Sequence, residues 1–133
     1  MIYLTDATKD WVVEDGWRIA PAGVPWIKEG YQIQVGEGSY VGDGVEIGEA
    51  VHIGDEVLIC DWVYIGDGVH IGDGVRISKN VTISDDVTIS DGVYIGDAAR
   101  IGRKVTIGKS AIINHGANIL QATIIEDRAG IVY

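Results

Sequence analysis

Isoleucine recurs at every sixth position along most of this chain, from Ile47 to Ile131, without a miss. A valine, or towards the C-terminus a smaller residue such as alanine or threonine, stands two positions before each isoleucine. The same phase extends back to Ile33, which gives seventeen consecutive hexads with no insertion. A period of six is incompatible with an amphipathic helix, whose apolar stripe needs spacings of three and four residues.

The repeating unit, Val-x-Ile-Gly-Asp-Gly, predicts a short strand followed by a sharp corner. Valine and isoleucine point to one side of the strand and x to the other, because side chains alternate along a strand. Glycine tolerates positive φ and lets the backbone turn. Three strands and three corners make one 18-residue coil, and coils stack about 4.8 Å apart. The sequence therefore predicts an all-β, single-domain, triangular parallel β-solenoid of about six coils, on the order of 27 Å long.

The hexads at Ile65–His70 and Ile71–Arg76 read Ile-Gly-Asp-Gly-Val-x. This pattern resembles the bacterial transferase hexapeptide repeat, and the resemblance covers about residues 33–131. It implies a left-handed parallel β-helix. General chain chirality favours right-handed crossovers, so the handedness is expected from the resemblance alone.

Residues 1–32 do not fit the repeat and are predicted to form an N-terminal β cap, with the β-helix spanning residues 33–133. The segment holds three of the four tryptophans and both prolines. Asp15-Gly16 predicts a hairpin turn between two short strands. A solenoid needs a lid over its first coil, so we expect the tryptophan rings to cover the end of the core. The alternative is an aromatic platform that binds sugar.

Composition narrows the classes of partner. The formal net charge of −10 would repel phosphate backbones, so nucleic acid is not an expected partner. We expect no membrane span, because no run approaches about 18–20 apolar residues. The N-terminus lacks the pattern of a signal peptide, and Cys60 is the single cysteine. These features predict a cytoplasmic protein, or a particle-borne or exported one without a classical signal.

The outward residues x fall on three faces when every eighteenth residue is taken. One face combines tyrosine and arginine with aliphatic residues, a composition typical of interfaces. We expect this face to mediate self-association, and the family resemblance implies a homotrimer. The alternative is that scattered apolar residues on a sheet face are ordinary. The face consists of Tyr40, Leu58, Arg76, Tyr94 and Ile112.

His52 and His70 lie one coil apart on another face and are candidate ligands of a divalent cation such as zinc. The pair is similar to part of the three-histidine site of gamma-class carbonic anhydrases. The spacing to His115, the remaining histidine, does not fit that family. A third ligand would have to come from a neighbouring chain, and two solvated, stacked histidines are the alternative.

Acyl transfer is the other candidate chemistry. Residues 112–117, Ile-Ile-Asn-His-Gly-Ala, resemble a coil of the sugar acetyltransferases of the sialic-acid type. In that group a histidine acts as general base and acetyl-CoA binds along the prism between subunits. The positions expected for the base and for the aspartate before it hold Gln121 and Leu120. His115, at the equivalent corner of the previous hexad, is the candidate substitute.

Aspartates recur at the corners in columns 18 residues apart, as in Asp55, Asp73 and Asp91. Divalent cations could relieve their repulsion, but solvated corners are the favoured interpretation. Because the repeat is never broken, the favoured function is a non-catalytic, self-associating scaffold or assembly module. The alternatives are a CoA-dependent O- or N-acyltransferase acting on a sugar or amine, and a metal site like that of gamma-class carbonic anhydrases. No cofactor is certain from the sequence, and if the protein is an enzyme, hexapeptide-type acyl transfer is the expected reaction.

Overall fold

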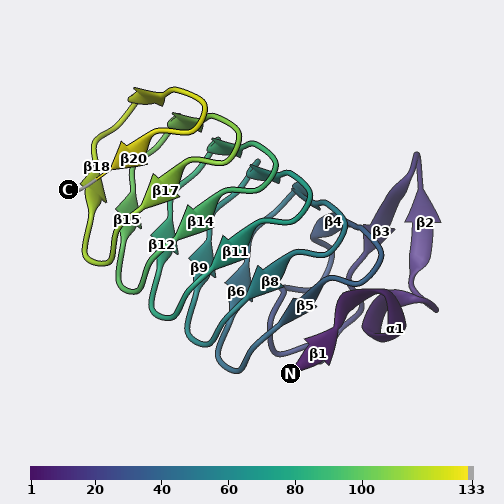
Figure 1. Cartoon of the computed structure of the whole chain (residues 1–133). Helices are drawn as coiled ribbons and strands as arrows, with labels where there is room; N and C mark the ends of the chain where they lie inside the picture. Colours follow the sequence, from purple (N-terminus) through teal and green to yellow (C-terminus); the bar gives the residue numbers. More distant parts are fainter. Residues whose placement is uncertain (132–133) are drawn as a thin grey trace.

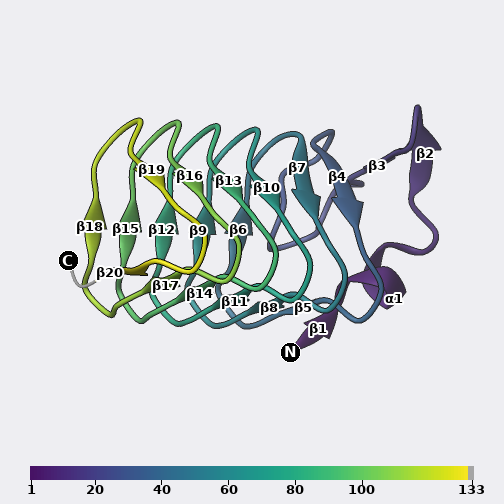
Figure 2. The same ribbon diagram turned by 45° about the horizontal axis from the view of Figure 1, so that its top comes forward.

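The chain winds into a triangular prism whose three sides are β-sheets, in which the strands of the hexads pair in parallel (Figure 1). The computed structural model describes residues 1–131. Successive coils stack along one axis, with the N-terminal segment at one end and the C-terminus at the other (Figures 1 and 2). The winding is left-handed, as the family resemblance implied.

Each hexad contributes one short strand, so the seventeen predicted hexads become strands β4 to β20. Sheet A contains β1 (Ile2–Tyr3), β5 (Tyr40–Val41), β8 (Leu58–Ile59), β11 (Arg76–Ile77), β14 (Tyr94–Ile95), β17 (Ile112–Ile113) and β20 (Gly130–Ile131). Sheet B contains β2 (Val12–Glu14), β3 (Trp17–Ile19), β4 (Gln32–Val35), β7 (Val51–Ile53), β10 (His70–Ile71), β13 (Thr88–Ile89), β16 (Thr106–Ile107) and β19 (Ile124–Ile125). Sheet C contains β6 (Glu46–Ile47), β9 (Tyr64–Ile65), β12 (Thr82–Ile83), β15 (Arg100–Ile101) and β18 (Asn118–Ile119).

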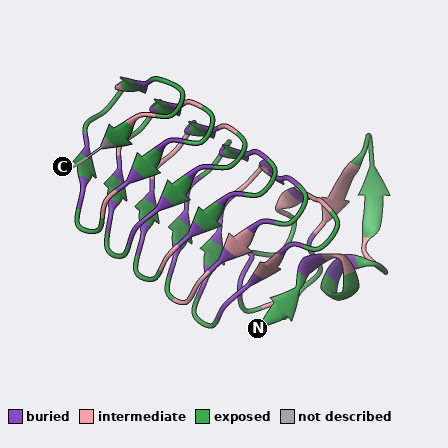
Figure 3. Ribbon diagram, viewed as in Figure 1, coloured by how far each residue is buried: buried purple, intermediate pink, exposed green. Residues whose placement is uncertain are grey.

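The register between strands confirms the predicted 18-residue coil. In sheet B, for example, His70 pairs with His52 on one side and with Thr88 on the other. Inward isoleucines from Ile53 to Ile107 are each at most 1% exposed and form one continuous core. The outward residues of the same strands are mostly exposed (Figure 3). The inward and outward phases of the hexad are therefore as predicted.

The last residue of each corner adopts a left-handed conformation. Glycine is present there in some hexads, such as Gly68 with φ of 69°. In ten other hexads the position is not glycine, which the consensus unit did not predict. For an ordinary L-residue this conformation costs roughly 1–2 kcal/mol. The ten residues are Ala50, Glu56, Trp62, Asn80, Asp86, Ala98, Lys104, Ser110, Ala122 and Arg128.

The corner aspartates do more than face solvent. In eight of them the carboxylate accepts a hydrogen bond from a backbone N–H one coil earlier; Asp73 Oδ1, for example, lies 2.8 Å from the nitrogen of Asp55. Asp91 repeats the contact with the nitrogen of Asp73 at 2.8 Å. We call this set the aspartate ladder; its acceptors are Asp55, Asp61, Asp67, Asp73, Asp85, Asp91, Asp97 and Asp127.

The N-terminal segment lies beside the first coil, where β1 pairs with β5 and β3 pairs with β4. The predicted hairpin is present, with β2 and β3 antiparallel around Asp15 and Gly16, both of which have positive φ. The segment also contains a short helix, α1 (Leu4–Thr8), that the sequence pattern did not predict. Trp26 is buried and stacks on Trp11 with ring centroids 5.5 Å apart. Within residues 1–131, no helix is long and apolar enough to cross a membrane.

Candidate functional site

His52 and His70 lie side by side on the outer surface of sheet B. Their rings are stacked, with centroids 4.5 Å apart and planes 5° apart. Nδ1 of His52 lies 2.8 Å from Oε1 of Gln34. An amide oxygen only accepts, so this contact places the proton of a neutral His52 on Nδ1. Burial, and then the nearby charge of His70, lower the pKa of His52.

The stacked pair does not make a chelating site within one chain. The nitrogen lone pairs of the two rings lie in nearly parallel planes, whereas shared coordination of zinc requires them to converge on one point. Nδ1 of His52 is already engaged by Gln34. Among residues 1–131, three or more His, Cys, Asp or Glu side chains do not gather in an arrangement that could hold a metal ion. A metal site here remains a hypothesis that needs ligands from another chain.

His115 lies at an exposed corner, away from the other two histidines. Its slot in the hexad is the one that aspartate occupies in the ladder, following Asp61 and Asp97 in the same column. The carboxylate of Asp97, one coil earlier, accepts the N–H of Lys79 at 3.2 Å. In the described part of the chain, the imidazole of His115 therefore has no hydrogen-bonded carboxylate to fix its tautomer. Gln121 and Leu120 are exposed one hexad further on.

The predicted association face is a continuous ladder on sheet A. Tyr40, Leu58, Arg76, Tyr94 and Ile112 occupy neighbouring strands in register. We call these five residues the sheet A ladder. Tyr94 is 42% exposed and Ile112 is 50% exposed. Strand β1 extends the ladder at the capped end, where the ring of Tyr3 lies 5.2 Å from that of Tyr40.

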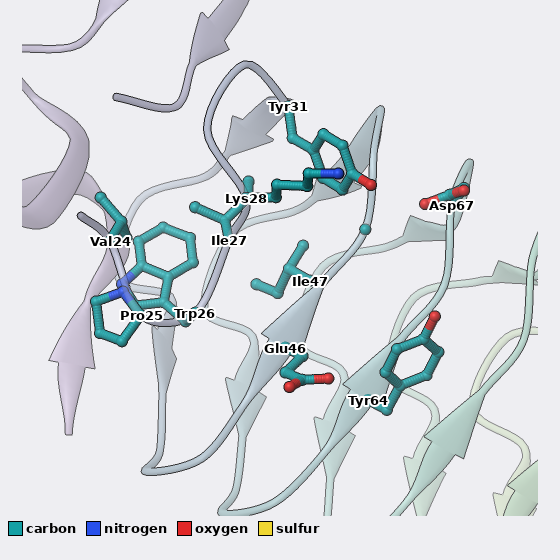
Figure 4. A pocket seen from close by; sticks show the side chains of 11 residues that line it. Val24, Pro25, Trp26, Ile27, Lys28, Tyr31, Glu46, Ile47, Tyr64 and Asp67 are labelled. Carbon is teal, nitrogen blue, oxygen red and sulfur yellow. The ribbon is translucent and has the colours of Figure 1, made fainter. Parts of the chain in front are cut away.

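A groove that the sequence interpretation missed lies beside the cap. It has a volume of about 440 Å³ and runs between the loop of residues 24–31 and the outer surface of sheet C (Figure 4). The loop is held there because Ile27 forms a parallel bridge with Ile47, whose N–H donates to the carbonyl of Trp26 at 2.9 Å. The groove is lined by Val24, Pro25, Trp26, Ile27, Lys28, Tyr31, Glu46, Ile47, Gly48, Tyr64 and Asp67.

Cys60 occupies a half-buried corner position. Burial raises the pKa of its thiol, so the side chain is held in the neutral, less nucleophilic form.

Comparison with known proteins gives a partial family match. A family model described as bacterial transferase hexapeptide (six repeats) matches residues 47–85. Among curated proteins, none matches the chain significantly. The matched segment comprises the hexads of β6 to β12, and the same hexad continues on both sides of it.

Two solved structures show weak likeness to the chain. The acetyltransferase domain of PglB from Neisseria gonorrhoeae, in complex with acetyl coenzyme A, is 20% identical with a TM-score of 0.36. The alignment covers 73% of this chain and 49% of that domain, so the chain spans about half the length of the domain. A Bacillus cereus structure, described provisionally as an acetyltransferase, is 18% identical with a TM-score of 0.26. It covers 74% of this chain and 75% of the other.

These identities and scores are too low to transfer an activity. The family match and the unbroken hexad have a firmer basis, because the matched residues are those that fill the core and turn the corners. Residues 47–85 therefore resemble the bacterial transferase hexapeptide repeat, and the same hexad pattern continues on both sides of the match.

Proposed function

We propose that the protein is a non-catalytic β-solenoid scaffold that associates with copies of itself, as a trimer, through the sheet A ladder. The observation that carries the proposal is the composition of this ladder. In a protein with a net charge of −10, its five residues include one charged side chain, the guanidinium of Arg76. Tyrosine and arginine are enriched at protein interfaces, and aspartate and glutamate are depleted there relative to the rest of the surface.

The regularity of the prism supports the same proposal. All seventeen hexad strands follow one another without an inserted loop, so the three sheets offer long, even surfaces. Such surfaces suit side-by-side packing of identical prisms. A cyclic trimer would bury the ladder of each copy and leave the acidic corners in solvent.

The test is the solution mass of the protein measured by light scattering. Arg76→Glu combined with Tyr94→Glu places two carboxylates on the ladder and is expected to give a monomer. The matched control, Arg100→Glu with Thr106→Glu, makes the same change in net charge on sheets C and B and should leave a trimer. A monomeric parent protein, or an unchanged mass of the ladder variant, would overturn the proposal.

CoA-dependent acyl transfer to a sugar or amine is the alternative that the match of residues 47–85 to the hexapeptide family model favours. It would require His115 to accept a proton from the acceptor within hydrogen-bond reach of the thioester. The missing carboxylate partner and the residues at positions 120 and 121 count against this within one chain. Calorimetry with CoA, and CoA release with sugar and amine acceptors, test it. Micromolar CoA binding with turnover that is lost in His115→Ala would replace the scaffold proposal.

A metal centre is the remaining alternative, and it can be tested separately. If His52 and His70 hold zinc together with a ligand from a neighbouring chain, the purified oligomer should carry zinc stoichiometrically. His52→Ala should then remove the zinc. An oligomer that takes up no zinc from a buffered solution would exclude this site.

A further inference from the structure

We propose that the groove between the cap loop and sheet C binds an organic cation: an ammonium group attached to a small apolar or aromatic body. The charge would lie between the rings of Tyr31 and Tyr64, close to the carboxylate of Glu46. The apolar body would contact Trp26 and Ile47. This site is independent of the sheet A ladder, because it lies on a different face of the prism.

The walls of the groove combine the two features that attract such a cation. Aromatic faces carry a negative quadrupole and attract ammonium groups within about 6 Å of the ring centroid. Tyr31 reaches the groove from the cap loop, and Tyr64 from β9 on the opposite side (Figure 4). Glu46 and Tyr64 are cross-strand neighbours in sheet C, so a carboxylate lies directly beside one of the rings.

The protein already holds one cation in this place. The ammonium of Lys28 lies over the ring of Tyr31, with Nζ 5.7 Å from the centroid. Lys28 is exposed and belongs to the loop that forms the groove wall. The contact demonstrates that the ring face of Tyr31 is accessible to an ammonium group. A ligand cation would therefore compete with Lys28 for the same surface.

The electrostatic surroundings favour a cation over an anion. Lys28 is the single basic side chain among the lining residues, against the carboxylates of Glu46 and Asp67. Burial, followed by the charges of Asp85, Asp67 and Glu46, raises the pKa of Tyr64. The phenol therefore stays neutral, and its oxygen can accept a hydrogen bond from an ammonium. An anionic ligand would meet repulsion from the same carboxylates.

The size of the groove also fits a small ligand. Its volume of about 440 Å³ lies within the range of small-molecule sites, about 300–1,000 Å³. Ile47 and Trp26, at the bottom of the groove, are held in place because they are 4% and 5% exposed and belong to the core. The apolar residues Val24 and Pro25 continue the wall beyond Trp26. The inorganic ammonium ion, which has no apolar body, would leave this apolar surface unused.

The experiment is a calorimetric titration of the intact protein with three benzyl compounds of similar shape. Benzylamine is cationic, benzyl alcohol is neutral and benzoate is anionic at neutral pH. We expect benzylamine to bind and the other two to bind at least about fivefold more weakly. Glu46→Gln and Tyr64→Leu should each weaken benzylamine binding by about fivefold. Tyr64→Phe, which keeps the ring but loses the phenol oxygen, should weaken binding less than Tyr64→Leu does. The matched carboxylate control Glu126→Gln should bind like the parent protein.

The response to Lys28→Met gives the sharpest distinction. Removing the competing ammonium while keeping an apolar stem should tighten benzylamine binding, by about two- to fivefold. Absence of benzylamine binding in both the parent protein and Lys28→Met would refute the proposal. Equal binding of benzyl alcohol would make the groove a plain apolar site. Preferential binding of benzoate, lost in Lys28→Met, would make it an anion site, and either result would overturn the assignment of a cation.

Discussion

Replacement of Asp73 tests whether the aspartate ladder stabilises the prism or whether its carboxylates are only solvated at the corners. Asp73 Oδ1 accepts the N–H of Asp55 at 2.8 Å, near the middle of the prism. A hydrogen bond to a charged group contributes about 1.5–3 kcal/mol. Repulsion from the neighbouring carboxylates opposes it: at about 4.8 Å in water, each neighbour costs about 0.9 kcal/mol before screening by salt. The two effects are similar in size, so a single substitution cannot separate them.

The pair Asp73→Asn and Asp73→Ala separates the two effects. Both variants remove the charge, but asparagine keeps an acceptor oxygen and alanine does not. The difference between them therefore reports the hydrogen bond, and we expect Asp73→Ala to be less stable than Asp73→Asn by about 1 kcal/mol. In urea unfolding followed by circular dichroism at fixed protein concentration, this corresponds to a midpoint lower by about 0.5 M.

Asp43 supplies the matched control for this comparison. It occupies the same corner position in the first coil, but the residue 18 positions earlier is Pro25, which has no N–H to donate. Asp43→Ala and Asp43→Asn should differ by less than about 0.5 kcal/mol. If the two Asp73 variants unfold at the same urea concentration, the carboxylates are no more than solvated charges, and the structural role of the ladder is wrong.

Three further predictions address the core, the corners and the histidine pair. Ile71→Asp should prevent soluble folding, because a buried carboxylate without a partner costs several kcal/mol. His70→Asp, on the outer surface, should be nearly neutral. Equal yields of soluble protein from the two variants would contradict the assigned inward and outward positions. Gly72→Ala should lower the free energy of unfolding in urea by about 3 kcal/mol, because its Cβ would clash with the carboxylate of Asp91 in the next coil. Gly74→Ala should lower it by about 1 kcal/mol, because only its φ of 67° is unfavourable for alanine. The reverse order would contradict this account. The lowered pKa of His52 means that its contribution to stability is present above the unfolded pKa near 6.5 and is lost as the pH falls below it. Between about pH 7.5 and about pH 5, the parent protein should therefore lose more stability than His52→Gln, and parallel losses in the two proteins would refute the assignment.

The prism could be predicted from the sequence because every hexad predicts the same short strand followed by the same corner. Inward and outward residues alternate along the hexads without an insertion, so one phase buries every isoleucine. The residues of the three faces could then be assigned by taking every eighteenth position. The hairpin at Asp15-Gly16 was predictable for a similar reason, since the turn type depends on two adjacent residues. Helix α1 was missed because a single short turn leaves no periodic signal.

The aspartate ladder was missed although the sequence contains a signal for it. Glycine at the first corner position is usually followed by aspartate 19 residues later, as in Gly54 and Asp73 or Gly72 and Asp91. The reason is steric, since a Cβ on Gly54 would lie 2.4 Å from Asp73 Oδ1. Where lysine or arginine stands 19 residues later, the first position is Cys60, Ser84 or Ser90 instead. Each corner therefore constrains the corner stacked on it.

The groove beside the cap could not be predicted in the same way. Lys28 and Tyr31 come from a segment without a repeat, and their placement opposite Glu46 and Tyr64 depends on the bridge between Ile27 and Ile47. A contact between a non-periodic loop and a sheet face has no spacing rule. The sequence showed only that the N-terminal segment is rich in aromatic residues. Such residues are expected equally in a segment that covers the end of the core and in one that forms a binding site.

The same corner rule bears on His115, the candidate base. It stands 19 residues after Gly96, where a ladder aspartate would be expected, and a Cβ on Gly96 would lie 2.5 Å from the backbone nitrogen of His115. The tight corner is thus kept although the aspartate is replaced. Gln121 stands in the same relation to Gly102. At these two positions, near the C-terminal end of the prism, the hydrogen bond of the aspartate ladder is absent. Among the described residues of one chain, no other carboxylate is hydrogen-bonded to His115. A catalytic His115 would consequently have to obtain its orienting group from a neighbouring copy, which makes the oligomeric state the measurement on which both the scaffold proposal and its enzymatic alternative depend.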